Sequence, residues 1–128
     1  MKQIFFISGL LVASLCFSCS HNNTSTGSLT VSESDHEYKI MADYLEQNTE
    51  KVEHYMNEKI GNKNHISFTH TVIDAELTLD DGTKIYVVNK PGTLKVNLDK
   101  DQNARSSYEE IKSLGEGLKS FLNEQKQQ

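Results

Sequence analysis

The chain has 128 residues, a length that leaves room for one domain. Acidic residues outnumber Lys and Arg by 18 to 13, which gives a formal net charge of -5 at pH 7. Because phosphate binding requires a basic surface, this balance argues against nucleic acid as a partner. No segment repeats at a period of about 20 to 50 residues, so the chain does not have the pattern of a repeat protein.

The first 18 residues have the pattern of a secretory signal. The positive residue Lys2 precedes a mostly apolar stretch over 4–17. This stretch is shorter than the roughly 20 apolar residues that a membrane-spanning helix needs. It ends in the letters F-S-C-S (17–20), and no A-x-A site for ordinary signal peptidase is evident. The pattern predicts that residues 1–18 form a signal peptide.

The end of this stretch resembles the lipobox of bacterial lipoproteins, in which a cysteine after a small residue becomes the lipidated first residue of the mature chain. Cys19 fits because Ser18 precedes it, whereas Cys16 follows Leu15 and fits badly. Cys16 itself departs from the family pattern, because it stands three positions before Cys19, where leucine is most usual. In this family an aspartate after the cysteine retains the protein in the inner membrane. Ser20 stands there in this chain, which implies the outer membrane of a Gram-negative cell.

The resemblance covers only about the first 22 residues, so it implies a location and no activity. It implies a membrane anchor through lipid at Cys19, with the domain in the periplasm. It also implies that Cys16 leaves with the signal, so that the fold has no cysteine for a disulfide. The alternative is a chain that is uncleaved or otherwise processed.

Residues 19–32 are expected to form a lipidated, flexible tether, because 21–28 are small, polar and without a hydrophobic period. A single domain is expected over 33–124. Residues 125–128 are polar and are expected to form a frayed tail.

The first element of the domain is predicted to be a helix over about 34–60. The S-x-x-E pattern of 34–37 is typical of a helix N-terminus. Apolar residues then recur at spacings of three and four as far as Ile60, with an interruption near 48–49. Gly61 is the expected residue just after a helix end.

Alternating apolar residues predict strands in the middle of the chain. Over 66–79 the alternation changes phase without an intervening turn, which predicts one long bent strand with a bulge or, alternatively, two strands. The sequence D-D-G at 80–82 predicts a hairpin turn. The sequence P-G at 91–92 predicts a type II turn between the last two strands, with a longer loop as the alternative.

The two turns predict strand registers that agree with each other. The first turn sets Leu77 opposite Ile85. The second turn sets Ile85 opposite Leu98 and Val87 opposite Val96. Both registers therefore place the same apolar residues on one face of an antiparallel meander.

The last predicted element is a helix over about 106–123, which begins with overlapping S-x-x-E patterns and has one continuous apolar face. Gly115 and Gly117 lie inside it, and they predict either a close approach of its backbone to the sheet or a helix that is loose at its middle. The order of elements predicts a two-layer α+β domain. Its antiparallel meander of three to four strands would be covered by an N-terminal and a C-terminal helix.

Oxygen-bearing side chains follow the last strand at the spacing of a calcium loop. Counted from the first, they fall at positions 1, 3, 5, 9 and 12, which resembles an EF-hand loop closed by a bidentate glutamate. Ala104 stands where this pattern needs glycine, Ser106 replaces an apolar residue, and a strand precedes the loop. These departures favour the alternative, a polar connection whose side chains cap the next helix. The candidate ligands are Asp99, Asp101, Asn103, Ser107 and Glu110.

The histidines give a weaker indication of metal binding. Glu50, His54 and Glu58 are four residues apart on the predicted helix and would form a weak zinc ladder. A solvated face with modest charge pairing is the favoured alternative. His65 and His70 are an odd number of residues apart, so on a regular strand they would face opposite sides. No cofactor is expected.

The chain contains no P-loop, no G-x-G-x-x-G motif and no serine in a nucleophile elbow. A domain of this size also leaves little room for a catalytic cleft. We therefore expect a non-enzymatic, lipid-anchored envelope protein that binds a protein partner, as accessory subunits of transport, secretion or assembly systems do. The alternatives are a small-ligand or ion-binding module near the membrane, and an immunity lipoprotein that neutralises a basic toxin.

Overall fold

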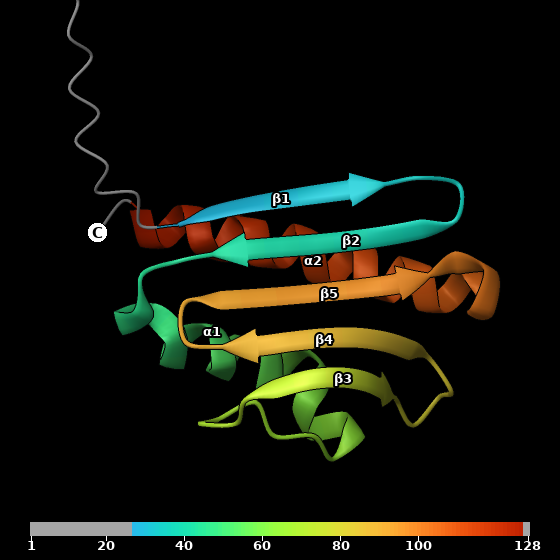
Figure 1. Cartoon of the computed structure of the whole chain (residues 1–128), viewed down its shortest axis with the longest axis horizontal. Coiled ribbons are helices and arrows are strands. Elements are labelled where there is room, and N and C mark those ends of the chain that lie inside the picture. Colours follow the sequence, from blue (N-terminus) through green and yellow to red (C-terminus); the bar gives the residue numbers. More distant parts are fainter. Residues whose placement is uncertain (1–26, 127–128) are drawn as a thin grey trace, which may run out of the picture.

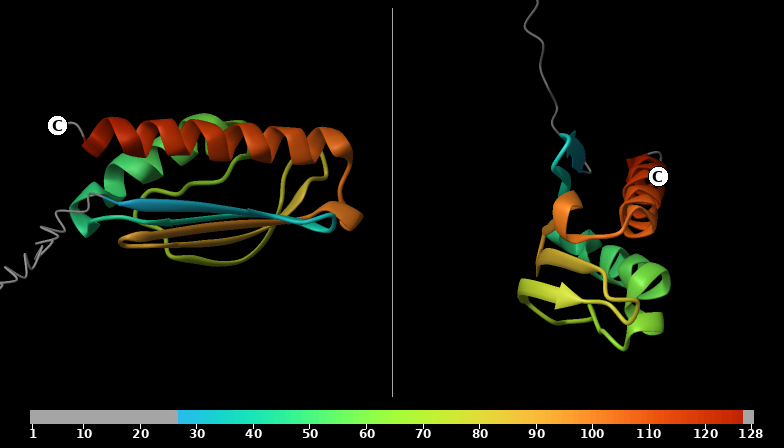
Figure 2. Two further views of the ribbon diagram at one scale, coloured as in Figure 1. Left: turned by 90° about the horizontal axis from the view of Figure 1, so that it is seen from above. Right: turned by 90° about the vertical axis from the view of Figure 1, so that its right-hand side faces the viewer.

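The computed structural model describes residues 27–126, which form one antiparallel sheet with helices on one of its faces (Figures 1 and 2). The strand order is β1-β2-β5-β4-β3. The strands are β1 (Ser28–Glu33), β2 (Glu37–Asp43), β3 (Ile73–Thr78), β4 (Lys84–Lys90) and β5 (Thr93–Asp99). The helices are η1 (Glu46–Asn48), α1 (Thr49–Met56) with its continuations η2 (Asn57–Gly61) and η3 (Asn62–Asn64), η4 (Lys100–Gln102) and α2 (Arg105–Lys126).

This architecture confirms the predicted two-layer α+β class and corrects two details. The sheet has five strands, and the predicted three to four did not include β1 and β2. The first helix lies in the middle of the chain, between β2 and β3, and not at the N-terminus of the domain.

The prediction of a helix over 34–60 is wrong for its first half, which belongs to a β-hairpin. β1 and β2 pair from Ser28 with Asp43 to Glu33 with Tyr38. The Ser34 hydroxyl accepts hydrogen bonds from the backbone N–H groups of residues 36 and 37, at 3.2 and 3.1 Å. The S-x-x-E pattern therefore closes a turn here and does not begin a helix.

Both predicted boundaries of the domain differ from the structure. Residues 28–32, which were assigned to the tether, form most of β1, so the domain begins before residue 33. At the other end α2 extends to Lys126, and the first half of the predicted tail is helical. Residues 127–128 and the predicted signal peptide lie outside the described residues.

The predicted strand over 66–79 is replaced by an irregular segment and a short strand. β3 covers only Ile73–Thr78, and His65 and His70 before it have left-handed backbones with φ of 58° and 50°. Between them Phe68 is fully buried, and its N–H donates to Asn57 Oδ1 at 2.8 Å. Buried side chains therefore hold this segment where the alternation predicted a strand.

The predicted registers of the meander are confirmed where the pairing is observed. Leu77 lies opposite Ile85, and Val87 lies opposite Val96. Lys90 pairs with Thr93, so P-G at 91–92 forms a two-residue turn, and the φ of 78° at the glycine fits the type II turn.

The helices cover the sheet in two parts, because α2 contacts β1 and β2 while the α1–η2 segment lies on the side of β4 and β3 (Figure 2). Gly115 explains how closely α2 packs. A Cβ at this position would lie 2.7 Å from the Tyr38 hydroxyl and 3.0 Å from Ile40 Cδ1 on β2. The predicted close approach of the helix backbone to the sheet is confirmed at Gly115.

Candidate functional site

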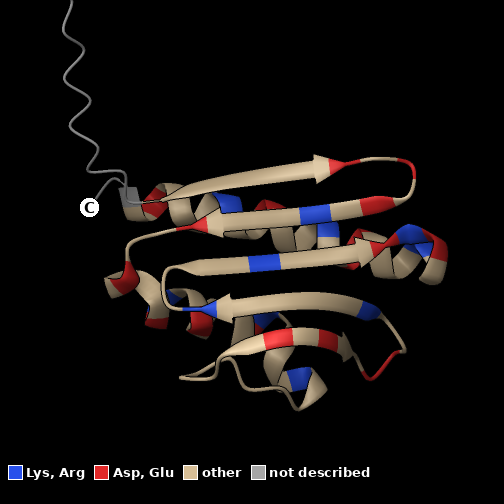
Figure 3. Ribbon diagram, in the orientation of Figure 1, with Lys and Arg blue, Asp and Glu red and all other residues tan. Residues whose placement is uncertain are grey.

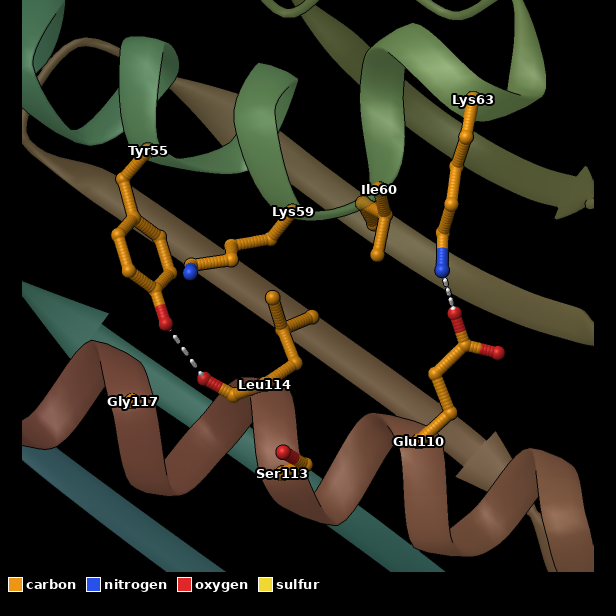
Figure 4. A pocket seen from close by; sticks show the side chains of 8 residues that line it. All are labelled: Tyr55, Lys59, Ile60, Lys63, Glu110, Ser113, Leu114 and Gly117. Carbon is orange, nitrogen blue, oxygen red and sulfur yellow. Dashed lines mark hydrogen bonds and ion pairs between the residues drawn. The ribbon is translucent and has the colours of Figure 1, made fainter.

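A pocket of about 340 Å³ opens between the α1–η3 segment (49–64) and α2 (Figure 4). Its volume is at the lower end of the range for small-ligand sites. Figure 4 shows that its side chains come from both helices and that two polar contacts cross between them. The lining residues are Tyr55, Lys59, Ile60, Lys63, Glu110, Ser113, Leu114 and Gly117.

The two polar contacts determine the electrostatics of the pocket. The Tyr55 hydroxyl donates to the carbonyl oxygen of Leu114 at 3.3 Å, and burial raises the pKa of this tyrosine. Lys63 forms an ion pair with Glu110. Lys59 Nζ lies 5.7 Å from the centre of the Tyr55 ring. With two lysines and one glutamate in the lining, the pocket has a net positive charge and favours an anionic group.

Gly117 makes room for the Tyr55 hydroxyl. The effect of Gly117→Ala on stability should therefore change sign when this hydroxyl is removed. Gly117→Ala would place a Cβ against the Tyr55 hydroxyl but 3.5 Å from its Cζ, an ordinary contact. In the wild-type background we expect Gly117→Ala to lower the free energy of unfolding by about 1–2 kcal/mol, because the steric overlap outweighs the higher helix propensity of alanine. In a Tyr55→Phe background the same change should stabilise by up to about 1 kcal/mol. Urea unfolding of the four chains measures this, and the same sign in both backgrounds would contradict the explanation.

A second cavity, of about 390 Å³, lies where the segment before β3 crosses the start of α1. Glu53 lines it, is only 4% exposed, and accepts the backbone N–H of His70 at 3.1 Å. Asn89 donates to the carbonyl oxygens of Phe68 and Thr71 at 3.2 and 2.9 Å. These buried polar side chains explain how the left-handed segment is held. The predicted sites did not include them, since nothing in their spacing distinguishes them from surface residues.

The predicted zinc ladder divides into two contacts with different partners. His54 Nε2 lies 3.2 Å from Glu58, and both side chains are well exposed. Glu50 instead faces His70, at 3.8 Å. Within residues 27–126 no group of three or more His, Cys, Asp or Glu side chains is placed to hold a metal ion.

The structure directs the five candidate calcium ligands to different partners. Asp99 accepts the N–H of Asp101 at 2.8 Å, and the carboxylate of Asp101 lies 2.9 Å from His36 Nδ1. Asn103 Oδ1 accepts the N–H of Lys84 at 2.8 Å. Ser107 is buried against the Thr83 hydroxyl at 2.6 Å, and Glu110 pairs with Lys63 in the inter-helix pocket. The loop side chains therefore connect β5 to β4, the β1–β2 turn and the helices.

The described helices leave the opposite face of the sheet uncovered (Figures 1 and 3). The β2–β5 and β4–β5 registers bring Met41, Lys95 and Val88 into one row across it. The neighbouring row contains Lys39, Asn97 and Tyr86. We call these six residues the central sheet patch.

The central sheet patch combines apolar and positive side chains. Met41 and Tyr86 are among the exposed large apolar residues of the described chain. The Tyr86 hydroxyl donates to Asp74 on β3, and this hydrogen bond raises the pKa of the tyrosine. Figure 3 shows basic residues on β2, β5 and β4, acidic residues at the ends of β2 and β5, and acidic residues alone on β3, so the face is mixed in charge over β2 and β5 and acidic at the β3 edge.

Comparisons with known proteins identify no relative of this chain. No protein-family model, no curated protein and no solved structure matches it. Cys19 lies outside the described residues. Over 27–126, no helix combines the length and the apolar character that crossing a membrane requires.

Proposed function

We propose that this chain is a small lipid-anchored protein of the cell envelope whose domain binds another envelope protein without catalysing a reaction. The lipobox-like residues around Cys19 support attachment to the outer membrane from the periplasmic side. The domain that follows is a sheet with helices on one face only. The uncovered face is the observation that carries the proposal.

The composition of the central sheet patch indicates the kind of partner. Met41 on β2 and Tyr86 and Val88 on β4 supply apolar side chains, and large exposed apolar groups within a polar surface are typical of binding sites. Lys95 on β5 lies between Met41 and Val88, whereas Lys39 forms an ion pair with Glu37 at 3.4 Å. The partner surface should therefore present apolar side chains with a carboxylate opposite Lys95.

Charge reversal in the central sheet patch tests this function. Full-length protein with its native N-terminus is extracted in detergent and used to capture envelope proteins. We expect the wild-type chain to retain one partner in stoichiometric amount, and Lys95→Glu to reduce that recovery at least about tenfold, because it opposes the partner's carboxylate. Lys119→Glu is the matched control on exposed α2 and should bind as the wild type does. No stoichiometric partner, or equal loss in both variants, would refute the proposal.

The inter-helix pocket favours a second candidate function, the binding of a small anionic ligand. Its volume of about 340 Å³ supports this candidate, as does the lining, in which Lys63 pairs with Glu110 and Lys59 supplies a second positive charge. Thermal-shift measurements with a panel of small carboxylates and phosphates should then show stabilisation that Lys59→Ala removes. No shift with any member of the panel would leave the protein-binding function as the better account.

A further inference from the structure

β1 is the outermost strand at one edge of the sheet, and no other described strand pairs with its outer side (Figure 1). The orientation of its backbone groups follows from the hairpin. Ser34 N–H donates to the Glu37 carbonyl at 2.9 Å, and hydrogen-bonded pairs alternate along an antiparallel ladder. The even-numbered residues of β1 therefore bond to β2. Leu29 and Val31 direct their N–H and C=O groups outward.

The two edges of the sheet differ in how well they resist further pairing. β1 pairs with β2 over six consecutive residues without a bulge, and residues 28–32 carry no charge and no proline. Its one charged residue, Glu33, is bound by Lys100 and Tyr108. β3 carries Asp74 and Glu76, charges of the kind that block edge pairing. Among the described strands, β1 is therefore the edge that is open to another strand.

We propose that β1 of one chain pairs with β1 of a second copy, antiparallel about a twofold axis at Thr30, so that two sheets become one. In this register Leu29 of each chain lies opposite Val31 of the other. Both residues have outward-facing backbone groups, so each of these two pairs exchanges two hydrogen bonds. Thr30 then lies opposite Thr30 as a non-hydrogen-bonded pair.

The side chains of β1 select a second copy in this register. Val31 is 41% exposed and Leu29 is partly buried, and both lie on the helix side of the sheet, next to Ile40 and Ala42 of β2. The pairing brings Leu29 of one chain against Val31 of the other. It therefore covers apolar surface that a single chain exposes to water. A shift of two residues in one direction would set Leu29 opposite Glu33, and in the other direction it would set Val31 opposite Gly27, so either shift removes an apolar pair. A shift of one residue would pair odd-numbered with even-numbered residues. The apolar side chains of the two chains would then lie on opposite faces of the joined sheet.

An engineered cysteine at the axis tests the pairing in the full-length chain. The Cα atoms of a non-hydrogen-bonded pair are about 4.5 Å apart, which allows a disulfide. Thr30→Cys should therefore give a covalent dimer as the main product of mild oxidation in cells. Ser32→Cys is the matched control. It faces Ser28 of the other copy, so it should not cross-link with itself but should do so when co-produced with Ser28→Cys. The wild-type chain measures any background from its own two cysteines.

Blocking the edge gives the second measurement. Val31→Lys introduces an inward-pointing charge at the edge, and in the Thr30→Cys background it should lower the cross-linked fraction at least about tenfold. Val72→Lys, at another exposed valine, should leave the cross-link unchanged. Sedimentation of the detergent-solubilised chain should show twice the mass of the Val31→Lys chain. The pairing is overturned if Thr30→Cys stays monomeric, if its product has the mass of another protein, or if Val31→Lys has no effect.

Discussion

Replacing Phe68 by alanine is expected to lower the free energy of unfolding by about 3–5 kcal/mol, the range for removal of a fully buried aromatic ring. Phe68 is 0% exposed and lies in the irregular segment between η3 and β3. A Cβ added at Gly61 would lie 3.3 Å from its ring, which shows how tightly the ring is enclosed. Its loss also weakens the contact of the segment with Asn57 and Asn89.

Val72→Ala is the matched control for this prediction. Val72 belongs to the same apolar alternation in the sequence, but it is 73% exposed in the structure. Its substitution should change the free energy of unfolding by no more than about 0.5 kcal/mol. Urea unfolding of residues 27–128 measures both changes. Similar losses for the two variants would mean that the segment is a strand, as the alternation predicts, and that Phe68 has no special place in the core.

The second large effect concerns attachment to the membrane. If Cys19 carries the lipid, Cys19→Ala should abolish labelling by a radioactive fatty acid and move the protein from the membrane fraction to the soluble fraction. Two or more acyl chains anchor a protein stably, and their loss leaves the domain without an attachment. Cys16→Ala should leave both the labelling and the location unchanged, because Cys16 is expected to be removed with the signal. Labelling that depends on Cys16 would overturn the assignment.

The meander and α2 were predictable because their information is local. The D-D-G and P-G turns lie between the strands that they connect, so each turn determines one register, and Leu77 with Ile85 and Val87 with Val96 follow. The helix over 105–126 begins near its S-x-x-E patterns and has an apolar face that is continuous in sequence. In both cases the signals that specify the element, a turn or a periodic apolar face, lie within the element itself or between the strands that it joins.

The segment before α1 shows why local patterns were insufficient. Tyr38, Met41 and Leu45 fit a helical period, while Tyr38, Ile40 and Ala42 fit the strand period. The structure buries the second set, because β2 lies between β1 and β5. The pairing with β5 joins residues 50 or more positions apart, and no turn signal in the sequence specifies it.

The candidate sites depend on such distant pairs even more. Lys63 and Glu110 close the inter-helix pocket from two helices, and the central sheet patch joins β2, β5 and β4. Neither combination has a spacing that a single sequence reveals. By itself the sequence determined the α+β class, the meander registers, the last helix and an expected location in the envelope. Only the tertiary structure decided that β1 and β2 complete the sheet and that, within residues 27–126, one face is uncovered and β1 is an open edge, because strand order depends on which distant segments bury each other's apolar faces.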